Sequence, residues 1–341
     1  MNRLLRNAAL ASLDGLGINA LFRFVHRKGA LILLYHGVAN DDYAWPRGYD
    51  DRHVSRSLFR QHLLFLKRKG YTFVTLTELL RALEEERDER KLATISLDDG
   101  FENVVTNAYP IMRELDAKGC VYVCSDLIGS ERLLWPDEIN AVLQTHPEPT
   151  FRFRFRQREI IYNLEADDLR NAAVADVRQR LRMLSNRERF EHLQQFHDHA
   201  VPEWSSEFRF PSWAQLRELD RGVLEVAAHT RTHADCVSLA SEEELEDELV
   251  RSKEEIERQM GCSVPHFAYP FGSYDDRVLA YVRNAGYESA VSTMAGFNDA
   301  KSDRYQLKRM CGGGDFMGFK ASASGSAKVV LEMRDVLSRA G

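Results

Sequence analysis

The sequence of 341 residues lacks the features that mark secreted, membrane-spanning and nucleic-acid-binding proteins. The opening Met-Asn-Arg-Leu-Leu-Arg is not followed by an uninterrupted apolar core and a cleavage site, so we expect no signal peptide. No apolar run is long enough to cross a bilayer. With 46 Lys and Arg against 52 Asp and Glu the chain is acidic, whereas a general nucleic-acid binder is expected to be basic.

The chain also lacks a disulfide framework and a linker. Five cysteines, Cys120, Cys124, Cys236, Cys262 and Cys311, show no paired spacing, and their odd number would leave one over. A reducing compartment fits this pattern, so we expect a cytoplasmic protein. No internal repeat, low-complexity tract or Pro-rich segment divides the chain, and 44% hydrophobic residues can bury a large core. We therefore expect one large domain rather than two.

Apolar runs and helical patterns alternate along the chain. Strands are expected near residues 31–35, 71–74, 93–97, 120–124, 223–228, 266–269 and 288–291, and helices at 58–69, 76–86, 103–118, 242–260 and 275–285. Such alternation predicts a parallel sheet with crossover helices. Periodicity alone leaves open whether the sheet is a barrel or a doubly wound open sheet.

Two adjacent carboxylates, Asp98 and Asp99, follow the strand expected at 93–97. Their side chains point in different directions, so one could bind a metal while the other accepts a proton. Gly100 permits a tight exit from the strand. Taken alone, this Asp-Asp-Gly is more typical of a turn that caps the next helix.

His229 comes just after the strand expected at 223–228, and His233 lies four residues further on. If this segment coils into a helical turn, both imidazoles share a face and can reach one divalent ion. Two histidines and one carboxylate with open positions are typical of catalytic metal sites. An isolated His-x3-His is nevertheless more often a pair of surface or core histidines without a metal.

Two further strands end in residues of chemical interest. Residues 267–272, Phe-Ala-Tyr-Pro-Phe-Gly, run into a Pro/Gly turn, which is a weak motif alone. The apolar run from Ala30 ends at His36, and a histidine in this position is more often a hydrogen-bonded structural residue. All the candidates thus lie at strand carboxyl ends, where (β/α) barrels place their active sites.

In this order and spacing the motifs resemble those of polysaccharide deacetylases, carbohydrate esterase family 4 with its nodulation-type homology domain. Residues 96–100, Ser-Leu-Asp-Asp-Gly, correspond to the family's threonine-phenylalanine-Asp-Asp-Gly, and residues 229–233 to its His-(Ser/Thr)-x-x-His. The resemblance implies a distorted (β/α)7 barrel with Asp98 as general base. It also implies that Asp99, His229 and His233 bind a divalent metal, Zn²⁺ ahead of Co²⁺, Ni²⁺ or Fe²⁺.

The sequence departs from the family pattern in two places. The arginine-proline-proline-tyrosine-glycine motif appears as Ala-Tyr-Pro-Phe-Gly at 268–272, a form common in a bacterial branch, and Arg309 is our expected substitute for the arginine that orients the base. The late leucine-x-histidine motif, which supplies the general acid, is missing. His36 is expected to replace it, as in the circularly permuted poly-N-acetylglucosamine deacetylases. The resemblance places the oxyanion-stabilising backbone N–H at Phe271.

The resemblance implies a hydrolase of non-peptide carbon–nitrogen bonds, with an acetylated glycan as its partner. We expect N-deacetylation of amino sugars in a bacterial surface polysaccharide or its lipid-linked precursor. The metal would lower the pKa of a bound water, Asp98 would take its proton and His36 would protonate the leaving amine. Alternatives are a small-molecule metal-dependent amidase and a degenerate glycan-binding protein; the retained carboxylates and histidines argue against the second.

We divide the chain into an N-terminal amphipathic helical segment (1–29), a deacetylase domain (30–320) and a C-terminal tail and helix (321–341). The first segment either packs on the barrel, which we favour, or lies on a membrane surface. Residues 322–327 are expected to be flexible, ahead of a helix at 328–339.

Residues from about 135 to 210 interrupt the alternation of strands and helices and are predicted to be a mostly helical insertion. Phe and Arg alternate over residues 151–156, as in a strand with one apolar face, and residues 166–184 and 187–200 have helical spacing. The insertion either shapes specificity, for instance by contacting an anionic glycan, or is a solvated helical cap.

Overall fold

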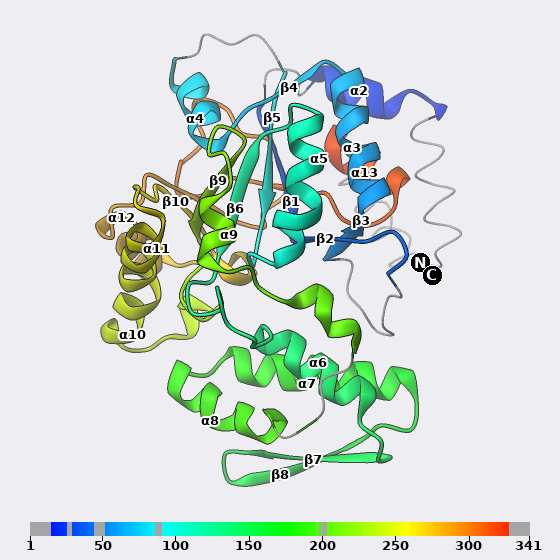
Figure 1. Cartoon of the computed structure of the whole chain (residues 1–341), viewed down its shortest axis with the longest axis vertical. Helices are drawn as coiled ribbons and strands as arrows, with labels where there is room; N and C mark the ends of the chain where they lie inside the picture. The colour runs from blue at the N-terminus through cyan, green and yellow to red at the C-terminus, as the bar shows by residue number, and fades with distance from the viewer. Residues whose placement is uncertain are drawn as a thin grey trace, which may run out of the picture.

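A curled parallel sheet forms the centre of the molecule in the computed structural model, which describes residues 15–25, 29–43, 52–85, 91–197, 199 and 203–326 (Figure 1). Within these residues the sheet has eight strands, seven of them in the order β11-β10-β9-β6-β5-β1-β12, while β4 pairs beside β5. The strands are β1 (Leu31–Tyr35), β4 (Tyr71–Phe73), β5 (Lys91–Leu97), β6 (Gly119–Val123), β9 (Leu224–Ala228), β10 (His266–Ala268), β11 (Ser289–Val291) and β12 (Met310–Cys311). All seven predicted strands are present. The two-residue β12 was not predicted, because so short a strand carries no periodicity.

The segment 304–311 connects the two edges of the sheet. On the β11 side, the Ala290 N–H donates to the Arg304 carbonyl at 2.8 Å and the Ser292 N–H donates to the Leu307 carbonyl at 2.9 Å. On the other side, β12 pairs with Leu33 and Leu34 of β1. The sheet therefore curls into a half-barrel whose edges meet through this segment, which confirms the predicted distorted barrel.

The register aligns the carboxyl ends of the central strands. Tyr35 lies opposite Leu97, and Val123 lies opposite Ala228. Just beyond the strands, the Asp98 N–H donates to the Tyr35 carbonyl and the His229 N–H donates to the Val123 carbonyl, both at 2.9 Å. The residues that follow these strands are consequently gathered on one rim of the barrel.

Helices cover the outside of the sheet, as expected for crossover connections. They are α2 (Ile18–Val25), α3 (Arg56–Arg68), α4 (Leu76–Glu85), η1 (Val104–Ala108) continuing into α5 (Tyr109–Glu114), α9 (Trp213–Arg217), α10 (Glu242–Glu246), η4 (Asp247–Arg251), α11 (Ser252–Met260), α12 (Asp276–Asn284) and α13 (Phe316–Ser324). Alternate strand residues face opposite ways: Val121 and Val123 join the core under the helices, whereas Cys120 and Tyr122 join a second cluster. The five predicted helices are present, two of them interrupted by π turns, η1 and η4.

Short elements complete the connections: the two-stranded pair β2 (Gly37–Ala39) and β3 (His53–Ser55), and the 3-10 turns η2 (Glu203–Phe208), η3 (Cys236–Ser238) and η5 (Pro270–Gly272). All five cysteines fall in the described part of the chain, and none of them is in a disulfide. Among the described residues, no helix combines the length and apolarity needed to cross a membrane.

The insertion lies below the sheet in Figure 1 and has a hydrophobic core of its own. It consists of α6 (Trp135–Thr145), the antiparallel hairpin of β7 (Thr150–Phe155) and β8 (Arg158–Asn163), α7 (Asp167–Arg182) and α8 (Asn186–His197). Phe151 and Phe153 are buried while Arg152 and Arg154 are exposed, which confirms the predicted strand with one apolar face. The sequence analysis did not identify α6 or the second hairpin strand, β8, as separate elements.

Two predictions concern the ends of the chain. Residues 322–324 belong to α13, so the prediction that they are flexible was wrong: Asp315 caps this helix and its Phe319 is buried. The described part of the N-terminal segment forms α2, which packs against α13. The first fourteen residues and the helix predicted at 328–339 lie outside the described residues, and the domain boundaries at 29/30 and 320/321 stay predictions.

We predict that Phe153→Ala destabilises the protein by about 3–5 kcal/mol, because it removes a fully buried ring and leaves a cavity in the core of the insertion. Denaturant unfolding followed by circular dichroism measures the change. Arg154→Ala, one residue along the same strand and exposed, is the control and should stay within about 0.5 kcal/mol of wild type. Equal effects of the two changes would contradict the assignment of this core.

Candidate functional site

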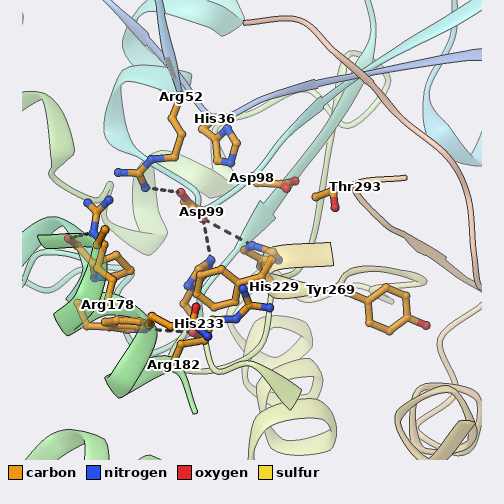
Figure 2. Close-up of a pocket in the computed structure, with 15 residues that line it drawn as sticks. His36, Arg52, Asp98, Asp99, Arg178, Arg182, His229, His233, Tyr269 and Thr293 are labelled. Carbon is orange, nitrogen blue, oxygen red and sulfur yellow. Dashed lines mark hydrogen bonds and ion pairs between the residues drawn. The ribbon is translucent and has the colours of Figure 1, made fainter. Parts of the chain in front are cut away.

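A pocket of about 350 Å³ lies at the rim where the strands end (Figure 2). Six of the seven residues that the sequence pattern singled out line it: His36, Asp98, Asp99, His229, His233 and Phe271. The seventh, Arg309, is buried against Asp98. Residues distant in the sequence thus converge on one site, although their chemical roles stay predictions.

The two histidines and Asp99 have the arrangement of metal ligands. Oδ1 of Asp99 lies 3.5 Å from Nε2 of His229 and 3.4 Å from Nε2 of His233. The three potential ligand atoms all lie within 4.8 Å of one another, and all three residues are buried. Ligands about 2.0–2.2 Å from a tetrahedral ion are separated by roughly 3.3–3.6 Å, so the spacing to Asp99 fits a metal such as Zn²⁺.

The hydrogen-bonding state of these side chains also fits a metal. Both carboxylate oxygens of Asp99 are buried without a hydrogen bond, which is costly for an anion unless a cation compensates it. Nδ1 of His229 lies 2.8 Å from the Ala268 carbonyl, a contact that orients the ring with Nε2 toward Asp99. This outer hydrogen bond is typical of metal-binding histidines.

Burial and the short distances between these side chains shift the pKa values of Asp99 and His233. Burial alone would raise the pKa of Asp99, but His229 and His233 hold it well below its ordinary value. Burial lowers the pKa of His233 to about 3. The site therefore offers an ionised carboxylate and a neutral imidazole at His233, the protonation states that metal binding requires.

The loop from His229 to His233 is not the helical turn that the i, i+4 spacing suggested, and that expectation was wrong. Thr230 has φ of 64° and His233 has φ of 59°, both in the left-handed region that residues other than Gly rarely adopt. Asp99 is also left-handed, with φ of 71°. These backbone reversals, rather than a helix face, bring the two imidazoles together, with ring centroids 5.0 Å apart.

Asp98 is held by the guanidinium of Arg309 in a paired geometry. Nη1 donates to Oδ1 at 2.6 Å and Nη2 donates to Oδ2 at 2.8 Å. Arg309 is itself 1% exposed and donates further to Ser96 Oγ and to the Ser292 carbonyl. Burial would raise the pKa of Asp98, but Arg309, with smaller contributions from His229 and His36, keeps it below its ordinary value. The structure thus pairs Asp98 with a buried cation from the segment that follows β11, while the role of Arg309 as a substitute for the motif arginine stays a prediction.

His36 enters the pocket from the end of β1, on the opposite side of Asp98 and Asp99 from His229 and His233 in the view of Figure 2. Burial lowers its pKa, opposed by the charges of Asp99 and Asp98. A histidine in this position can exchange a proton with a molecule bound in the pocket.

The turn after β10 forms another wall. Phe271 has φ of 59°, and Gly272 follows with φ of 70°. A Cβ atom at Gly272 would lie 2.0 Å from Oγ1 of Thr293, so only glycine fits there. The Phe271 ring packs 4.8 Å from the His233 ring and 6.1 Å from that of Trp135.

Several residues of the pocket were missed by the sequence prediction. Arg52 lies 3.6 Å from Oδ2 of Asp99 and forms an ion pair with Asp137. From α7 of the insertion, Arg178 and Arg182 line the pocket, and the Arg182 guanidinium lies 4.3 Å from the centre of the Phe271 ring. No local pattern marks Arg178 and Arg182 as pocket residues, because only the packing of the insertion on the barrel brings them there.

Comparison with known proteins agrees with this architecture. The model of the polysaccharide deacetylase family matches residues 191–290. The Bacillus subtilis protein YxkH, provisionally assigned as a polysaccharide deacetylase, is 18% identical over 280 residues, which cover 82% of this chain and 70% of YxkH.

Two solved structures share the fold. IcaB from Ammonifex degensii has a TM-score of 0.57 at 18% identity, covering 88% of this chain and 97% of IcaB. A de-N-acetylase from Aggregatibacter actinomycetemcomitans has a TM-score of 0.52 at 18% identity, covering 82% of this chain and 93% of that protein.

We predict that the metal-free protein binds one equivalent of Zn²⁺, measured by competition with a chromophoric chelator. Asp99→Asn, His229→Ala and His233→Ala should each weaken binding by more than the roughly 10–100-fold that loss of an outer-shell partner costs, because each removes a ligand. His36→Ala, in the same pocket, should bind zinc like the wild type. Unchanged affinity in all three ligand variants would refute this site.

Arg309→Met should lower the free energy of unfolding by about 3–5 kcal/mol at pH 7, because it leaves the buried Asp98 carboxylate unpaired. In the wild type the pKa of Asp98 is depressed, so its contribution to stability is present above the ordinary pKa and is lost as the pH falls. In the variant this pKa rises, and protonation of Asp98 should shrink the deficit as the pH falls.

Denaturant unfolding between pH 7 and pH 4 measures this effect, and Lys301→Met, at an exposed position, is the control. A deficit that does not depend on pH would mean that Arg309 contributes packing rather than charge.

Proposed function

We propose that the chain is a hydrolase of carbohydrate acetyl groups, as its similarity to polysaccharide deacetylases supports, and that it removes N-acetyl groups from amino sugars of a bacterial surface polysaccharide or its lipid-linked precursor. The observation that carries the proposal is the pairing of two carboxylates with different partners at the end of β5. Asp99 faces two imidazoles, whereas Asp98 faces a guanidinium. One carboxylate is therefore suited to hold a metal and the other to accept a proton.

Asp99, His229 and His233 would hold the divalent metal. When bound, the metal supplies Lewis acidity that acidifies a water molecule and polarises the acetyl carbonyl. Zn²⁺ suits two imidazoles and one carboxylate, as do Co²⁺, Ni²⁺ and Fe²⁺.

Asp98 acts as the general base, taking the proton of the attacking water. The paired contacts from Arg309 fix the orientation of the carboxylate and keep it ionised, so it is ready to accept a proton at neutral pH. The base is nevertheless weakened by this cation, and this favours release of the proton later in the cycle.

The backbone N–H of Phe271 stabilises the oxyanion that forms when water attacks the acetyl carbonyl. Phe271 and Gly272 are both left-handed, and Thr293 leaves no space for a Cβ atom at Gly272, so this turn requires glycine after the donor. The apolar walls of Trp135 and Phe271 are suited to the methyl group of the acetyl moiety.

His36 protonates the leaving nitrogen. An amine is a poorer leaving group than an alcohol, so N-deacetylation requires this proton more than ester hydrolysis does. The position of His36 in the pocket, beside both carboxylates, supports the amide as the scissile bond.

We predict that the zinc-loaded protein releases acetate from N-acetylated amino sugars and that Asp98→Asn lowers kcat by about 10²–10⁴-fold, because the amide cannot accept the proton of water. Acetate release from a panel of N-acetylglucosamine oligomers and acetylated small amides measures the activity. Zinc affinity, determined on the same samples, controls for loss of the metal. Release from small amides alone would favour a small-molecule amidase, and no release from any substrate would favour a glycan-binding role.

His36→Ala should lower kcat on an N-acetylated sugar by about 10²–10⁴-fold and on a matched O-acetylated sugar by much less, since the alcohol leaves more easily. The ratio of the two losses is the measured quantity, and it is insensitive to the fraction of folded protein. Equal losses on both substrates would mean that His36 acts in another step than protonation of the leaving group.

A further inference from the structure

A buried carboxylate, Glu248, lies behind the loop that carries His229 and His233. It is 0% exposed. Its Oε2 accepts hydrogen bonds from the backbone N–H groups of Arg231 at 2.8 Å and Thr232 at 2.9 Å, and its Oε1 accepts one from the Thr232 hydroxyl at 2.6 Å. Three donors of the loop thus converge on one side chain.

These hydrogen bonds lie between two left-handed residues of the loop. Arg231 and Thr232 are the two residues between Thr230 and His233, whose φ angles are 64° and 59°. A left-handed conformation is unfavourable for such residues and persists only where surrounding contacts enforce it. Glu248 bonds to the two amides that lie between these strained positions, so it supplies that enforcement.

A π turn places Glu248 against the loop. It lies in η4 (Asp247–Arg251), inserted between α10 and α11. Its neighbour Asp247 also bonds to the loop, accepting from the Arg231 guanidinium at 2.6 and 2.7 Å. Two adjacent helix residues therefore both reach the loop, and π turns of this kind are frequent at functional sites.

The insertion completes this network. From the start of α8, Asn186 Nδ2 donates to Oε1 of Glu248 at 2.5 Å. Arg189, one turn further along and 0% exposed, donates to the Thr232 hydroxyl oxygen at 3.0 Å and also bonds to Asn186 Oδ1. A buried guanidinium and a buried carboxylate thus share the same loop residue, which reduces the cost of burying either charge alone.

We propose that Glu248, together with Asn186 and Arg189 of the insertion, forms a positioning network that presets the His229–His233 loop for metal binding. The insertion is then part of the support of the metal centre and not only a cap over the pocket. This inference rests on the metal site of the proposed function, but it concerns the geometry of the loop and its affinity for the ion.

The test compares Glu248→Gln and Asn186→Ala with the wild type in zinc titrations of the metal-free full-length protein. Loss of an outer-shell partner typically costs about 10–100-fold in metal affinity, and we expect losses in this range for both variants. The matched control is Arg187→Ala on the same turn of α8, where the side chain is exposed and pairs with Glu191. It should bind zinc like the wild type.

A second readout separates positioning from general stability. Hydrogen exchange of the loop containing Arg231 and Thr232, followed by mass spectrometry without metal, should accelerate at least tenfold in both variants, while exchange in β9 stays unchanged. Asn186→Ala removes only a partly buried side chain at the start of α8. It therefore provides the test if Glu248→Gln does not fold. Unchanged zinc affinity and unchanged loop exchange in a folded variant would overturn the proposal, even if its melting temperature fell.

These measurements need no acetylated substrate, so they are independent of the proposed reaction. If the variants lose zinc affinity but the wild type releases no acetate, the positioning network stands and the deacetylase assignment fails. If acetate is released and the variants bind zinc as the wild type does, the network is wrong and the assignment stands.

Discussion

Two adjacent carboxylates, buried at the end of one strand, impose the constraint around which the site is arranged. Asp98 and Asp99 are 3% and 1% exposed, and an isolated buried carboxylate would be neutralised rather than remain charged. The Asp98 carboxylate is fully paired with a guanidinium, whereas Asp99 makes no hydrogen bond within the described part of the chain and has two imidazoles and Arg52 within 4 Å. Because the compensation is unequal, the two neighbours differ in chemistry. The carboxylate without hydrogen bonds is the one suited to a metal ion.

The parallel sheet could be predicted from local patterns, and the residues that line the pocket could be predicted from those patterns together with the family resemblance, while their roles stay predictions. Apolar runs mark the strands, and a polar residue after each run marks the rim. The family resemblance showed that the motif arginine is missing, and Arg309 was the expected substitute. The structure places its guanidinium against Asp98.

Other features depend on tertiary contacts that leave no local trace. The i, i+4 spacing of His229 and His233 suggested a helix, but left-handed residues at Thr230 and His233 give the loop its shape, and no sequence rule foretells them for Thr and His. In the sequence, Glu248 is one of many glutamates in an acidic helical segment. Only the π turn and the contacts from the insertion distinguish it from the others. The arginines of α7 are likewise ordinary helix residues by pattern, and only the packing of the insertion brings them to the pocket.

The segment that joins the edges of the sheet also carries Arg309, and this links the completion of the fold to the charge balance around Asp98. A chain that ended before this segment would contain Asp98, Asp99, His36 and both histidines of the 229–233 loop, but it would lack the guanidinium that pairs with Asp98. Closure of the sheet and neutralisation of the buried Asp98 carboxylate are therefore a single event in folding, since both depend on residues 304–311.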